Sequence, residues 1–128
     1  MRFERRHDGL TYAITLRPRA DDKRLLRELE VEIYRKHASG DRHGFVWKLL
    51  FSEKELKIRR YEDRDDWTGS YRKLLEDVII KADWLEGEWY LEDIERTIRD
   101  LGVDKAVEHI LSHLKIVFGH PLSIPLRL

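Results

Sequence analysis

The sequence predicts an α+β fold: two antiparallel β-hairpins that are expected to share one sheet, an intervening helix or strand, and three C-terminal α-helices packed against them. Two observations predict this arrangement. Apolar residues alternate with polar ones in several stretches before residue 60, as expected for strands with one buried face. After residue 70, apolar residues recur three and four positions apart, which is the spacing of a helix with one buried stripe.

The N-terminal residues predict the first hairpin. Arg2 to His7 alternate around Phe3, and Leu10 to Arg17 are rich in β-branched and aromatic residues. The dipeptide Asp8-Gly9 between them is typical of a two-residue hairpin turn. Pro18 is expected to end the second strand, because proline has no N–H to donate to a neighbouring strand.

The segment 20–39 fits two interpretations. As a helix, it would be capped by Asp21 or Asp22 and would end before Gly40. One face of that helix would carry four apolar residues, Leu25, Leu26, Leu29 and Ile33. As a strand, the segment would alternate apolar and acidic residues, namely Leu29, Val31 and Ile33 with Glu28, Glu30 and Glu32. We favour a helix over 21–38 for its start and stop signals and keep the strand as the alternative.

The stretch Gly44 to Tyr61 predicts the second hairpin, around which the rest of the fold is organised. One face of its first strand carries four apolar residues, Phe45, Trp47, Leu49 and Phe51. Leu56 and Ile58 resume this pattern after a polar interruption, and the opposite face carries Lys48, Lys57 and Arg59. A lone hairpin is marginally stable in water, so we expect the aromatic face to pack on a helix over 71–82.

Three helices are expected to follow, over 70–83, 91–101 and 104–118. The stripe of the first consists of Tyr71, Leu74, Leu75, Val78 and Ala82. Gly102 and Gly119 are placed to end the other two. The last residues, 120–128, contain two prolines and are expected to form an extended tail. Since no linker or repeat interrupts the chain, we expect a single domain over 1–128, mainly sheet in 1–62 and helical in 66–119.

The composition limits the class of protein. With 25 basic and 25 acidic residues, the chain lacks the basic excess of a general nucleic-acid binder. Charged residues make up 39%, and Cys, Asn and Gln are absent, which is typical of a thermostable protein, although a biased genome or an engineered sequence would give the same counts. No apolar run is long enough to span a membrane, and the N-terminus lacks a signal peptide's apolar core, so we expect a cytoplasmic protein.

Two groups of side chains are candidates for metal binding. His109 and His113 would share one face of the last helix, which is half of a zinc site. A carboxylate cluster after the second hairpin has ligands suited to a divalent cation, namely Glu62, Asp63, Asp65 and Asp66. The patterns of zinc peptidases and of calcium loops are missing in both places. We therefore prefer surface histidines and a solvated loop, and expect neither a catalytic site nor a cofactor.

Basic residues on the second hairpin give an alternative function. Lys48, Lys57, Arg59 and Arg60 lie on or beside a predicted strand, with Tyr61 next to them. Cations interleaved with aromatic rings are typical of surfaces that hold single-stranded nucleic acid. The preferred interpretation is a solvated face whose charge is balanced by nearby glutamates. Nucleic acid is thus the alternative partner.

The expected function rests on apolar residues outside the helical stripes. On the predicted 70–83 helix, Ile80 and Trp84 point away from the stripe, and Trp89 and Tyr90 follow closely. Trp and Tyr are frequent anchors of protein interfaces, and a monomer rarely exposes a large apolar patch. We therefore expect these residues to be covered either by a second layer within the monomer, such as the proline-containing tail, or by another chain. The sequence therefore predicts a small non-catalytic protein that associates with itself or with another protein, with no small-molecule ligand evident.

Overall fold

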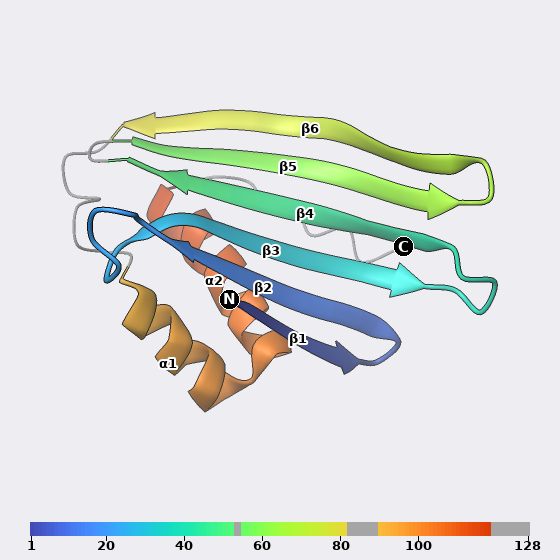
Figure 1. Ribbon diagram of the computed structural model, residues 1–128, viewed down its shortest axis with the longest axis horizontal. Helices are drawn as coiled ribbons and strands as arrows, with labels where there is room; N and C mark the ends of the chain where they lie inside the picture. Colours follow the sequence, from blue (N-terminus) through green and yellow to red (C-terminus); the bar gives the residue numbers. More distant parts are fainter. Residues whose placement is uncertain (53–54, 82–89, 119–128) are drawn as a thin grey trace.

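The computed structural model describes residues 1–52, 55–81 and 90–118, and within them a six-stranded antiparallel sheet with two helices (Figure 1). The strands lie side by side in chain order. They are β1 (Arg2–His7), β2 (Leu10–Pro18), β3 (Leu26–Lys36), β4 (Arg42–Phe51), β5 (Glu55–Asp66) and β6 (Gly69–Lys81). The helices α1 (Leu91–Leu101) and α2 (Val103–Phe118) lie on one side of the sheet, at its β1–β2 end. The α+β class is confirmed, whereas the arrangement of two hairpins packed against three helices is wrong.

The first hairpin is confirmed with its predicted turn. β1 pairs antiparallel with β2 from Arg2–Thr15 to His7–Leu10. Asp8 and Gly9 both have positive φ, 50° and 77°, as a two-residue type I′ turn requires. Such a turn matches the right-handed twist of the strands, so a local dipeptide signal was sufficient to place both strands.

The predicted helix over 21–38 is wrong, because most of this segment forms β3, the strand alternative. The predicted helix cap instead closes a turn: the Asp22 carboxylate accepts a hydrogen bond from the Arg24 backbone N–H at 3.0 Å. Gly40, with φ of 94°, lies in the turn between β3 and β4, where its N–H donates to the His37 carbonyl. Both signals for a helix therefore mark the turns at the two ends of a strand.

The second hairpin is confirmed as β4 and β5, and its two faces are those expected. We call the face that carries Ile14, Val31, Trp47 and Ile58 the inner face; all four are fully buried. Ile14, Val31 and Trp47 lie opposite one another on β2, β3 and β4, and Ile58 of β5 lies on the same face, opposite Leu49 of β4. The opposite, outer face carries Lys48, which lies between Glu30 of β3 and Arg59 of β5. The hairpin occupies the centre of the sheet, not an edge.

The predicted helix over 70–83 is also wrong, since its residues up to Lys81 form β6, which pairs with β5 along its length. Tyr61 pairs with Leu74 and Arg60 pairs with Glu76, so Leu75 is an extra residue in β6. Such a bulge shifts the alternation of faces by one residue. The apolar residues of β6 therefore mimic the spacing of a helix.

The other two predicted helices are confirmed, and they pack on the inner face at its β1–β2 end, whereas the predicted 71–82 helix does not exist. α2 packs on β1 and β2, and α1 packs on α2. Among the described side chains, their buried apolar residues are Ile94 and Ile98 in α1 and Ala106, Val107, Ile110 and Leu111 in α2. These side chains join Trp47 and the other inner-face residues in one hydrophobic cluster. Burial of this cluster supplies the main driving force for folding.

Cross-strand ion pairs cover the outer face, over which Figure 1 draws neither helix. Arg17 of β2 contacts Glu28 at 2.9 Å and Glu30 at 3.1 Å, both on β3. Val46 is buried although it lies on this face. The aliphatic stems of long charged side chains can bury such a residue while their head groups stay in water. The high charge content of the sequence thus has a structural role.

Among the described residues, no helix is long and apolar enough to cross a membrane. The predicted tail at 120–128 lies outside the described residues.

Candidate interaction surface

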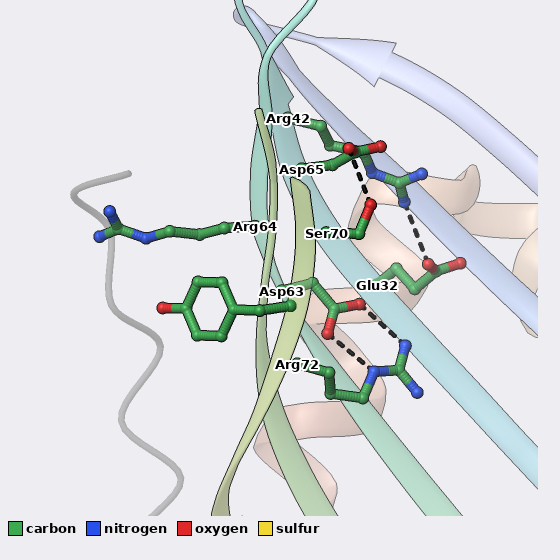
Figure 2. A pocket seen from close by; sticks show the side chains of 8 residues that line it. Glu32, Arg42, Asp63, Arg64, Asp65, Ser70 and Arg72 are labelled. Atoms are coloured by element: carbon green, nitrogen blue, oxygen red, sulfur yellow. Dashed lines mark hydrogen bonds and ion pairs between the residues drawn. The ribbon is translucent and has the colours of Figure 1, made fainter. Parts of the chain in front are cut away.

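A shallow polar pocket of about 420 Å³ lies where β4, β5 and β6 approach the β3–β4 and β5–β6 turns. Its lining residues are Glu32, Arg42, Asp63, Arg64, Asp65, Ser70, Tyr71 and Arg72. Figure 2 shows Arg42, Asp65 and Ser70 on one side of the strands, with Arg64 pointing to the other. This agrees with the register, in which alternate residues of β5 belong to opposite faces.

The charged groups of this pocket bind one another. Arg72 donates two hydrogen bonds to Asp63, each of 2.8 Å, and the hydrogen bond to Asp63 raises the pKa of Arg72 (Figure 2). Arg42 donates to Glu32 at 3.2 Å, and the Ser70 hydroxyl donates to Asp65 at 2.9 Å. A charged ligand would have to replace these pairs. The pocket therefore gives little support to a small-molecule site.

The predicted carboxylate cluster is divided between the two faces. Asp63 and Asp65 belong to the outer face, whereas Glu62 belongs to the inner face with His43. Within the part of the chain that the structure describes, no group of three or more His, Asp or Glu side chains could hold a metal ion. The register thus separates residues that the sequence places next to one another.

Glu62 joins a histidine and a tyrosine on the inner face. His43 Nε2 lies 2.9 Å from one carboxylate oxygen, and the Tyr71 hydroxyl donates to the other at 3.2 Å. The hydrogen bond with His43, followed by that with Tyr71, lowers the pKa of Glu62 against its ordinary 4.5. Loss of water around the Tyr71 hydroxyl, followed by the Glu62 charge, raises the pKa of Tyr71. The cluster joins β4, β5 and β6.

Glu62→Gln is expected to lower the free energy of unfolding near neutral pH and to have little effect in strong acid. A lowered pKa in the folded state means that the ionised carboxylate stabilises the fold above pH 4.5, and that this contribution is lost as the pH falls through the folded-state value. Urea unfolding at a series of pH values measures it. Glu92→Gln, at an exposed position of α1, is the control. An equal cost at both ends of the series would contradict the assignment.

The four basic residues predicted to bind nucleic acid do not share a face. Lys48, Lys57 and Arg59 lie on the outer face, whereas Arg60 lies on the inner face beside Trp47. Lys57, Arg59 and Arg60 are each paired with a carboxylate. Arg59 contacts Asp77 at 3.4 Å, Arg60 contacts Glu76 at 2.8 Å, and Lys57 lies 4.0 Å from Glu55. Lys48 lies 5.9 Å from the centre of the Tyr61 ring.

The predicted histidine pair lies on α2, with His109 exposed and His113 partly buried. The residues that support association are located only in part. Ile80 is half-buried in β6, lies opposite Leu56 and packs against the core, so its predicted place on a helix is wrong. Tyr90 is partly exposed at the start of α1. Trp84 and Trp89 lie outside the described residues.

Exposed apolar side chains gather on a different element, the edge strand β6. Of the described residues, seven large hydrophobic side chains are exposed, and four of them belong to β6 or the turn before it. These four are Trp67 (90% exposed), Tyr71 (47%), Leu74 (49%) and Ile79 (54%). Sequence reasoning missed this surface because it assigned the segment to a helix, where Tyr71 and Leu74 would be buried.

β6 also offers unpaired backbone groups. Within the described residues it pairs with β5 on one side only, and it is 13 residues long. An edge strand presents alternating N–H and C=O groups that can bind another strand, and natural proteins usually shorten, twist or charge such edges. This edge has both charges and the Leu75 bulge, together with apolar side chains on either side of that bulge.

Comparison with known proteins gives no relative: no family model, no curated protein and no solved structure matches this chain.

Proposed function

We propose that the protein is a non-catalytic binding protein that acts through protein–protein association along the free edge of β6. The observation that carries the proposal is the gathering of exposed apolar side chains on this strand and the turn before it. An extended segment can add to a sheet edge through backbone hydrogen bonds, with side-chain contacts giving specificity. Leu74 and Ile79 on the outer face, and Tyr71 on the inner face, supply such contacts.

The proposal is tested with the double variant Leu74→Lys, Ile79→Lys. Sedimentation of the purified protein over a concentration range and affinity capture from a lysate of the source cells should show a partner held by the wild type and lost by the variant. Leu101→Lys, at an exposed position of α1 away from the sheet edge, is the control and should behave as wild type. Equal association of wild type and double variant would overturn the proposal.

Nucleic-acid binding at the outer face is the second candidate. The observation that favours it is Tyr61, whose ring lies 5.9 Å from the Lys48 ammonium and 4.9 Å from the Arg72 guanidinium. A ring flanked by cations can stack a base beside a phosphate. The carboxylates paired with Arg59 and Arg72 weaken this candidate. A salt titration of single-strand binding tests it, since affinity through phosphates must fall as salt rises.

A further inference from the structure

We propose that the partner of the β6 edge is a second copy of this chain, paired antiparallel about a twofold axis at Leu74. The sheet of one copy would then continue into the sheet of the other. This inference rests on the proposed function and names its partner. It follows from the order of charges along β6, which is complementary to itself.

The charges of β6 form opposite pairs when the strand is placed antiparallel to itself. Two basic residues, Arg72 and Lys73, come before Leu74, and two acidic residues, Glu76 and Asp77, come after it. With Leu74 on the axis, Arg72 lies opposite Asp77 of the second copy, and Lys73 lies opposite Glu76. The twofold axis repeats each pair. Cross-strand pairs of opposite charge are stabilising in antiparallel sheets.

The bulge at Leu75 makes this pairing consistent with the two faces of the sheet. In a regular strand, Arg72 and Asp77 would point to opposite faces because they are five residues apart. The extra residue brings both to the outer face, where Arg72 bonds Asp63 and Asp77 bonds Arg59. The bulge, which gives the apolar residues of β6 the spacing of a helix, is therefore also the feature that allows the strand to pair with itself.

The pairing extends rows of alternating charge that already exist within each copy. On the outer face, Asp63 and Arg72 of one copy would be followed by Asp77 and Arg59 of the second copy. The row on the inner face would run Glu62, Lys73, then Glu76 and Arg60 of the second copy. Positive and negative side chains therefore alternate from strand to strand along the whole of each row.

The neighbouring registers are disfavoured. The twofold axis can move along β6 by one residue in either direction, not counting the bulged Leu75, without mixing the two faces of the sheet. The axis then passes through Lys73 or through Glu76, and that residue lies directly opposite the same residue of the second copy. Like charges in directly opposite positions destabilise a strand pair. Of these three registers, only the one with Leu74 on the axis avoids this, and it places the exposed Leu74 against Leu74 of the second copy. It also places Ile79 opposite Ser70.

Cysteine crosslinking tests the register, because the chain has no cysteine of its own. Leu74→Cys should form dimers with a short bis-maleimide crosslinker. Ile79→Cys, which is similarly exposed on the same face, should not form dimers, since position 79 of one copy would lie about 27 Å from position 79 of the other. A mixture of Ser70→Cys and Ile79→Cys should crosslink. Equal crosslinking of Leu74→Cys and Ile79→Cys, or none of Leu74→Cys at the highest concentration reached, would overturn the inference.

A charge exchange tests the pairs. Arg72→Asp and Asp77→Arg each place like charges opposite one another twice, so each alone should lose self-association about tenfold or more. The two variants mixed should associate again, because they are complementary. Sedimentation measures this, and circular dichroism checks that each variant is folded. Self-association of either variant at the wild-type level, or a mixture that stays monomeric, would overturn the inference. Capture of a different protein that Leu74→Lys, Ile79→Lys fails to capture would overturn it while leaving the proposed function standing.

Discussion

Trp47→Ala is expected to lower the free energy of unfolding by about 3–5 kcal/mol, the largest effect of any single substitution considered. Trp47 is completely buried at the centre of β4, between Val31 of β3 and Arg60 of β5. Its ring lies 6.4 Å from that of Phe45. Removing it would leave a cavity in the hydrophobic core, because a packed core relaxes only in part.

Chemical denaturation at a concentration too low for association measures this effect. Trp67→Ala is the matched control: the same residue type is removed at a position that is 90% exposed, and its cost should stay within about 0.5 kcal/mol. Trp47→Phe should cost less than Trp47→Ala. It keeps much of the ring and removes an indole N–H that has no hydrogen-bond partner within the described residues. Similar costs for Trp47→Ala and Trp67→Ala would contradict the position of β4 in the core.

Gly44→Ala is expected to destabilise the protein by about 1–3 kcal/mol or more, a large effect for a single added methyl group. A Cβ at Gly44 would lie 2.3 Å from the Tyr34 Cβ and 2.5 Å from the Ile33 carbonyl oxygen across the strand pair. Such contacts are sterically forbidden, and the backbone atoms involved cannot rotate away as a side chain could. β3 and β4 would have to separate at the Tyr34–Gly44 pair.

Thermal and urea unfolding measure the cost of Gly44→Ala. Lys48→Ala, on the same face of the same strand, is the control, and its effect should be smaller because it removes atoms at a partly exposed position. Wild-type stability for Gly44→Ala would show that β3 and β4 do not pair in this register.

Local signals were sufficient for about half of the fold. The Asp8-Gly9 turn, the alternation from Phe45 to Phe51 and the two C-terminal apolar stripes each lie within one element or one turn, and the structure confirms them. β3 was misassigned because Asp22 and Gly40, the residues that end a helix, also form the turns around a strand. A glutamate at every second position was the better signal.

The candidate interaction surface was beyond sequence reasoning for a different reason. The face on which a residue of β6 lies depends on the bulge at Leu75, and the position of a bulge is fixed by pairing with β5. The charge pairs depend on register in the same way. Arg59 and Arg60 are neighbours in sequence, yet they bind carboxylates on opposite faces, Asp77 and Glu76.

Hydrogen–deuterium exchange of β6, measured as a function of protein concentration, is the most direct test of the claim that its free edge is a binding surface. The backbone N–H groups of β6 that point away from β5 have no partner strand within residues 1–52, 55–81 and 90–118 of a single copy. The proposal predicts that their exchange slows as the protein associates, whereas exchange in β1, the opposite edge of the sheet, stays unchanged. Association that leaves β6 exchange unaltered, or that protects β1 instead, would contradict it.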